Sequence, residues 1–122
     1  MRNIERGMWR AKGLNSNEWH YGWRYSSGTL RERGTGIEWQ VDSSTLGEYT
    51  GIEDKNGEAI FEGDICKFGL HNNAFVSFCD GSFYFTWKGG KTHYASMTFR
   101  NDAEIIGNIY NNPKLLGYTY QI

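Results

Sequence analysis

The sequence predicts a mainly β fold, a small antiparallel barrel or curled sheet that ends in a short helical turn. Aromatic residues make up 16% of the chain, and aromatic side chains suit the half-buried surface of a sheet. Turn signals rich in glycine, asparagine and aspartate recur at short spacing between apolar runs. Helical periodicity is almost absent, so we expect about six or seven short strands.

Chain length and composition predict one domain. A chain of 122 residues buries roughly two-thirds of its unfolded surface on folding, which is enough for one core. The apolar content of 39% excludes a disordered chain. No apolar run reaches the roughly eighteen residues of a membrane helix, and no hydrophobic stretch follows the charged N-terminus. We therefore expect a cytoplasmic protein with no membrane partner, in which Cys66 and Cys79 stay as thiols.

The N-terminal half predicts two strands and one helical turn. Residues 19–25 place an aromatic side chain at every second position, which indicates a strand with one aromatic face. Residues 37–41 repeat the alternation after the glycine-rich loop 31–36. Asp42 follows as the cap of a short helical turn, and we expect Gly47 to close that turn.

The stretch 49–66, "YTGIEDKNGEAIFEGDIC", holds five carboxylates around one lysine. Asn56 and Gly57 predict a type I′ hairpin turn, because both residues tolerate the positive φ that this turn needs. The charged residues around them are then solvated. Gly63 predicts a bend between two strand segments, with Asp64 bonded to nearby backbone amides. The acids of this stretch are therefore interpreted as architectural.

The C-terminal half predicts a second tight hairpin at Asp80 and Gly81, with a register that sets Cys79 opposite Ser82 and Phe78 near Phe83. The remaining expected elements are a glycine turn at 88–91, strands at 92–99 and 104–110, and a helical turn capped by Asn112 with Pro113 at its first position.

Charge is unevenly distributed along the chain, although the total is only -1. Residues 1–33 carry seven basic and three acidic groups (net +4), and residues 34–66 carry one basic and eight acidic groups (net -7). Residues 67–122 carry five basic and three acidic groups (net +2). Complementary patches on one subunit can join two copies, so we expect a homo-oligomer. The alternative is a solvated surface of mixed sign.

Several segments, taken together and in order, resemble the YopX-like proteins of bacteriophages and prophages. The resemblance covers about residues 19–116, and the sequence departs from the family pattern at Ser43, at Cys66 and in the N-terminal stretch 4–9. The segments that carry it are "WHYG" (19–22), "VDSSTLGEYTG" (41–51), "YTGIEDKNGEAIFEGDI" (49–65), "VSFCDGSF" (76–83) and "EIIGNIYNNPKLL" (104–116).

The resemblance implies a single YopX-like domain over residues 1–122, mostly β, with a part similar to an SH3-type barrel at about 48–112. It also implies a gene carried by a phage or an integrated prophage. The family has no assigned activity, so the resemblance transfers no catalytic residue and implies no cofactor. The expected partners are a second copy of the chain and a phage or host protein.

Metal sites are disfavoured by spacing. The candidate zinc ligands are separated by five, eight and fourteen residues, unlike the closely paired ligands of zinc sites. The segment 54–58, "DKNGE", has its glycine three residues after Asp54, where a calcium loop needs five. We therefore expect no metal. The zinc ligands considered are Cys66, His71, Cys79 and His93.

Two groups of residues could form catalytic arrangements, but structural roles suit them better. Glu62 and Asp64 flank Gly63 and could form an acid and base pair, but paired acids beside a glycine more often accept backbone hydrogen bonds. Cys66 as a nucleophile would need a histidine base within hydrogen-bond reach, and a thiol beside Ile65 fits a strand core better. We expect no enzyme.

A binding surface is the functional hypothesis that the residues favour. The segment 83–94, "FYFTWKGGKTHY", interleaves aromatic rings with cations, a pattern suited to stacking bases while the cations meet phosphate. Against nucleic acid stands the near-neutral total charge. The leading hypothesis is therefore a non-enzymatic interaction module, and nucleic-acid binding is the alternative. The candidate binding residues are Trp87, Lys88, Lys91, His93 and Tyr94.

Overall fold

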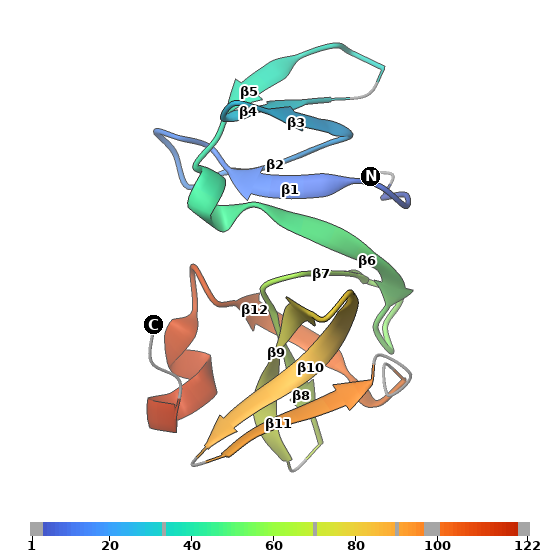
Figure 1. Cartoon of the computed structure of the whole chain (residues 1–122), viewed down its shortest axis with the longest axis vertical. Coiled ribbons are helices and arrows are strands. Elements are labelled where there is room, and N and C mark those ends of the chain that lie inside the picture. Colours follow the sequence, from blue (N-terminus) through green and yellow to red (C-terminus); the bar gives the residue numbers. More distant parts are fainter. Residues whose placement is uncertain (1–3, 33, 70, 90, 97–100, 120–122) are drawn as a thin grey trace. The chain divides into compact units, whose positions relative to one another are not determined.

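Two compact units make up the chain in the computed structural model, Met1–Gly51 (unit 1) and Ile52–Ile122 (unit 2). The described residues form twelve strands, antiparallel in every assigned pair, and short 3₁₀ turns (Figure 1). No helix in this part of the chain is long and apolar enough to cross a membrane. The structure describes residues 4–32, 34–69, 71–89, 91–96 and 101–119.

Unit 1 contains two small antiparallel sheets. In one, β1 lies between β2 and the start of β6, and the other has the order β3-β4-β5. Their core is built on Ala11, Leu30 and Val41, which are almost fully buried. The elements are β1 (Trp9–Lys12), β2 (Trp19–Gly22), β3 (Arg24–Ser26), β4 (Thr29–Arg31), β5 (Glu38–Gln40), η1 (Ser43–Thr45) and β6 (Gly47–Glu53), which continues into unit 2.

The single strand predicted for residues 19–25 is wrong, because the segment divides at Trp23 between the two sheets of unit 1. The Trp23 amide donates to the carbonyl of Arg31 at 3.0 Å. A Cβ at Gly22 would clash with that same carbonyl, so only glycine allows this close approach. The buried side chain of β2 is His20, whose ring stacks on Trp39 with centroids 3.9 Å apart.

The predicted cap at Asp42 is confirmed. Its Oδ1 accepts hydrogen bonds from the Ser44 amide at 3.0 Å and the Ser44 hydroxyl at 2.7 Å. These bonds hold the pKa of Asp42 below its usual value. The capped segment is a single 3₁₀ turn, whose C-cap is Leu46. Gly47 is the first residue of β6, so the prediction that Gly47 closes the turn is wrong.

Unit 2 is a five-stranded antiparallel sheet in the order β11-β10-β9-β8-β12, with β7 paired beside β6. One apolar cluster includes Ile60, Val76 and Phe85, and a second joins Phe75 to Leu116 of the C-terminal turn. The elements are β7 (Ala59–Phe61), β8 (Asp64–Phe68), β9 (His71–Cys79), β10 (Ser82–Gly89), β11 (Lys91–Ser96), β12 (Glu104–Asn108) and η3 (Pro113–Thr119).

The predicted mainly β, antiparallel fold is confirmed, but the sheet of unit 2 does not close into a barrel within the described residues. β11 and β12 remain the two ends of the sheet. At the start of β12, the carbonyl of Ala103, the residue before the strand, and the amide of Ile105 are bonded by the turn between β6 and β7 instead of by a strand. That turn satisfies this stretch of the edge without a further strand.

The hairpin predicted at Asp80 and Gly81 is confirmed. Both residues have positive φ, 50° and 84°, as a type I′ turn requires. Cys79 lies opposite Ser82, in the predicted register.

The predicted C-terminal helical turn is present as η3. The Leu115 amide donates to the carbonyl of Asn112 at 3.0 Å, so the turn begins where the sequence predicts. The side-chain oxygen of Asn112, however, accepts from the Asn108 amide at 3.2 Å. Asn112 therefore fastens the turn to the end of β12, a role that its predicted capping function did not include.

Candidate functional site

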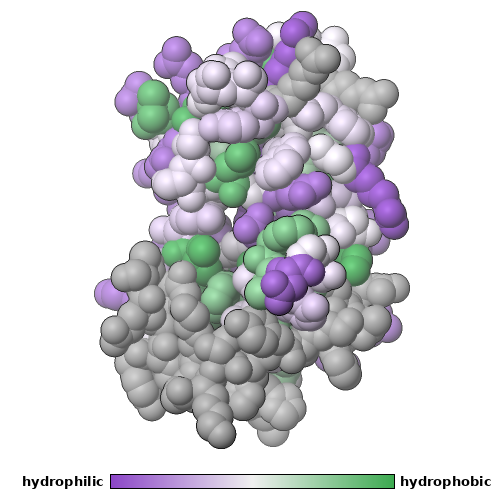
Figure 2. Space-filling view, in the orientation of Figure 1, coloured by the Kyte–Doolittle hydropathy of each residue, from purple (hydrophilic) through white to green (hydrophobic). Residues whose placement is uncertain are grey.

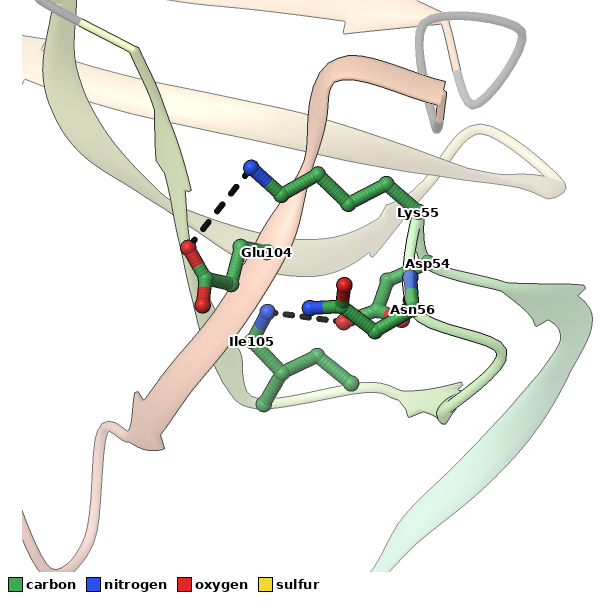
Figure 3. Close-up of polar contacts among 5 residues, drawn as sticks. All are labelled: Asp54, Lys55, Asn56, Glu104 and Ile105. Carbon is green, nitrogen blue, oxygen red and sulfur yellow. Dashed lines mark hydrogen bonds and ion pairs between the residues drawn. The ribbon is translucent and has the colours of Figure 1, made fainter.

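Asp54 is a buried carboxylate at the start of the turn between β6 and β7. Only 7% of the residue is exposed. Its Oδ1 accepts from the backbone amides of Asn56 at 2.8 Å and Glu58 at 2.9 Å. Its Oδ2 accepts from the amide of Ile105 on β12 at 3.0 Å (Figure 3). One side chain thus organises the turn and ties it to the edge of the sheet, and we call these three bonds the Asp54 clamp.

The clamp explains why the predicted type I′ turn does not form. The Gly57 amide donates to the carbonyl of Asp54 at 3.0 Å, and the Asp54 amide donates to the carbonyl of Glu58 at 2.8 Å. Gly57 has φ +81°, whereas Asn56 is not among the residues with positive φ. This is a three-residue loop with a glycine bulge. The carboxylate of Asp54 fixes it by binding two loop amides, so this acid is not solvated as the sequence predicts.

A second pair of contacts fastens the same turn to β12. The Lys55 amide donates to the carbonyl of Ala103 at 3.0 Å. Lys55 Nζ lies 3.7 Å from Glu104 Oε1, with side chains 45% and 42% exposed, so this ion pair contributes little. The carbonyl of Ala103 and the amide of Ile105, on either side of Glu104, are therefore both hydrogen-bonded to this turn, as they would be to a neighbouring strand.

The bend at Gly63 is the second corner of this stretch. Gly63 has φ +94°, its amide donates to Val76 at 2.8 Å and its carbonyl accepts from Ile109 at 2.9 Å. Asp64 is 2% exposed, and its Oδ2 accepts from the Phe61 amide at 2.7 Å. The carboxylate therefore binds the backbone across the bend, next to the half-buried Glu62.

Metal-binding geometry is absent from the described residues: no three histidine, cysteine, aspartate or glutamate side chains in them gather closely enough to hold an ion. The side chains of His71 and His93, two of the predicted zinc candidates, lie outside the described part.

Cys66 is a core residue. It is fully buried in the cluster with Val76 and Phe85. Burial raises the pKa of its thiol far above the usual range, and the nearby carboxylates of Asp64 and Asp54 add to the shift. A thiol that keeps its proton is a poor nucleophile. Cys66 and the half-buried Cys79 are both free thiols.

The raised pKa of Cys66 predicts a loss of stability at alkaline pH. Above about pH 8.5 the unfolded chain releases this proton while the folded chain keeps it, so the free energy of unfolding falls by up to ~1.4 kcal/mol per pH unit. Denaturant titrations of wild type and Cys66→Val across this range measure the difference in slope, because all other titrating groups are shared. Equal slopes would contradict the assignment.

The predicted binding strip lies on the hairpin of β10 and β11. Trp87 packs against the core of unit 2, with its ring 5.2 Å from that of Phe68. The backbone register sets His93 opposite Trp87 and Tyr94 opposite Thr86. Part of the Trp87 ring is thus used in core packing and is not open to a ligand. That the segment 83–94 is a binding surface stays a prediction. The side chains outside the described part of the structure are those of Lys88, Lys91, His93 and Tyr94.

An exposed aromatic pair lies at the other hairpin of the sheet. The sequence predicts that Phe78 lies near Phe83, and the register confirms it, but neither residue is among the predicted binding residues. Phe78 is 52% exposed, and its ring meets that of Phe83 edge-on with centroids 5.0 Å apart. Phe83 in turn packs against the core cluster. The signal was present in the pattern: Phe78 lies two residues after the buried Val76, so both belong to the same face of β9. We call Phe78 and Phe83 the tip pair.

Comparison with known proteins gives one family. Residues 3–117 match the family described as YopX protein, and the match therefore covers nearly the whole chain and both units. No individual curated protein matches. The matched range includes the Asp54 turn, the bend at Gly63 and the hairpin at Asp80. The chain belongs to the YopX family.

Proposed function

We propose that this YopX-family chain is a non-enzymatic interaction module of a phage or prophage. It acts in the cytoplasm of the bacterial host, where it associates with itself and with a phage or host protein. Residues 1–122 form a single domain in this proposal, and the part at about 48–112 is SH3-like. The support for that assignment is the antiparallel sheet of unit 2, whose edge at β12 is bonded by the Asp54 clamp.

The tip pair carries the proposal. Aromatic side chains with a large exposed area are enriched at protein interfaces, and Phe78 exposes half of its surface. On the face that Figure 2 shows, hydrophilic and near-neutral residues cover most of the described surface, with smaller hydrophobic areas among them. An enzyme acting through Asp64 or Cys66 has less support, since the first binds a backbone amide and the second is buried with a raised pKa.

Light scattering across protein concentration and salt tests the self-association. The average molar mass of the wild type should rise above that of the monomer as the concentration increases. In Phe78→Ser this rise should occur only at higher concentration. Ile37→Ser is the matched control, because Ile37 is exposed to a similar extent in unit 1. A strict monomer at every concentration and salt, with no change in Phe78→Ser, would refute self-association through the tip pair.

Nucleic-acid binding through the β10 and β11 hairpin is the second candidate. Its support is the register that brings the backbone of Trp87 opposite His93, with Lys88 and Lys91 near the connecting turn. Titration of labelled single-stranded and duplex oligonucleotides tests it, because binding through phosphates weakens steeply as salt rises. Lys91→Gln should reduce the salt dependence. Absence of binding at low salt would exclude this candidate.

A further inference from the structure

Asn56 and Gly57 are the only asparagine-glycine pair in the sequence. Both residues are exposed, and a Cβ added to Gly57 would meet no atom within 4 Å other than those of its two chain neighbours. Asparagine is a thermolabile residue, and a following glycine has no side chain to keep its amide nitrogen away from the asparagine carboxamide. The sequence and the open surroundings of this loop therefore both favour attack of the Gly57 nitrogen on the Asn56 side chain.

The chemistry is an intramolecular acyl transfer. The Gly57 nitrogen loses its proton and attacks Cγ of Asn56. A new bond forms between the Gly57 nitrogen and Cγ, and the Cγ–Nδ2 bond breaks. Nδ2 takes up the proton and leaves as ammonia. Water then adds to either carbonyl of the five-membered ring and opens it to aspartate or isoaspartate. Water is the only co-reactant, and no electron donor or acceptor is required.

We propose that Asn56 is a site of spontaneous deamidation that is gated by the Asp54 clamp, and that conversion in turn releases the clamp from β12. In the folded loop the Gly57 amide donates to the carbonyl of Asp54, and the Asn56 amide donates to its carboxylate. Ring closure needs the Gly57 nitrogen free of that bond, so the reaction proceeds from the transiently opened turn.

The products disturb the turn that slows their formation. Either product adds a carboxylate to a loop that is flanked by Glu53, Asp54 and Glu58, so the new negative charge lies within three residues of three others. Isoaspartate also adds a methylene to the main chain of the three-residue loop. The bond from the Asp54 amide to Glu58 closes that loop. The Asp54 carboxylate that accepts from Ile105 also binds the backbone amides of Asn56 and Glu58, so a change in the loop reaches the bond to β12 through this side chain.

Peptide mapping by mass spectrometry tests the gate. Wild type, Asp54→Asn and Asn56→Gln are incubated in mildly alkaline buffer, and isoaspartate is labelled by isoaspartyl methyltransferase. Asp54→Asn should convert Asn56 about tenfold faster, the factor that ~1.4 kcal/mol of lost turn stability produces. Asn56→Gln should remain unlabelled in this loop. Circular dichroism verifies that the variant is folded, and wild type in denaturant gives the ungated rate.

Two results would overturn the proposal. If Asn15, which is exposed in unit 1 and precedes Ser16, converts as fast as Asn56 in Asp54→Asn, the pair has no special reactivity. If wild type and Asp54→Asn convert at equal rates while both are folded, the clamp is not the gate. Release of the clamp from β12 is tested separately. Protein in which Asn56 has been converted should show faster hydrogen exchange at the Ile105 amide, and unchanged exchange there would refute the release.

Discussion

Asp54→Ala is expected to lower the free energy of unfolding by about 3 to 5 kcal/mol. Three backbone amides lose a charged acceptor, and each hydrogen bond to a buried charged group contributes roughly 1.5–3 kcal/mol, of which water recovers part where the loop is exposed. The expected loss is concentrated at Ile105, because its amide belongs to the edge of the sheet. Urea unfolding followed by circular dichroism measures the effect.

Glu104→Gln is the matched control for this experiment. It removes the exposed ion pair with Lys55 and leaves the clamp intact, so we expect a loss of no more than about 0.5 kcal/mol. The loss in Asp54→Asn should lie between those of Glu104→Gln and Asp54→Ala. Asparagine keeps one carbonyl oxygen as an acceptor and places an amide NH₂ donor where the other acceptor was. If Asp54→Ala costs no more than Glu104→Gln, the clamp does not stabilise the sheet.

The features predicted well from sequence are those that few neighbouring residues determine. Asp80 and Gly81 specify their hairpin through their own φ preferences, and the register of β9 and β10 follows from that turn. The cap at Asp42 is equally local, because it needs only Ser44 two residues later.

Long-range partners explain what the sequence did not reveal. The partner of Asp54 is Ile105, 51 residues further along the chain, so no local pattern could show that Asp54 would be buried instead of solvated. The division of residues 19–25 has the same origin, because it depends on the approach of Gly22 to Arg31 in another sheet. β1 and β4 were missed because strands of three or four residues carry little periodic signal.

The candidate site was only partly predictable for a related reason. Alternation shows that Phe78 and Val76 share a face of β9, but not how far along that face the core extends. Phe78 lies beyond its end and is exposed, while Trp87, a predicted binding residue, is partly buried and packs against Phe68 of the core. The extent of a core depends on what covers each strand, and one strand does not contain that information.

Gly63→Ala is expected to lower the free energy of unfolding by about 2 to 4 kcal/mol. At φ +94° an alanine is strained by roughly 1–2 kcal/mol. Its Cβ would also lie 3.1 Å from Cε2 of Tyr110, so the ring must shift. The backbone cannot relax easily, because the amide of Gly63 is bonded to Val76 and its carbonyl to Ile109. Urea unfolding measures the loss.

Gly57→Ala separates the two causes, since Gly57 has a similar φ of +81° but open space around a Cβ. It should cost only about 1 kcal/mol, from backbone strain alone. The excess in Gly63→Ala then belongs to the crowding with Tyr110. A double-mutant cycle with Tyr110→Ala should show that crowding as a coupling of roughly 0.5–1 kcal/mol or more. Equal losses in the two glycine variants, with no coupling to Tyr110, would mean that the bend at Gly63 tolerates a side chain and requires glycine only for its φ.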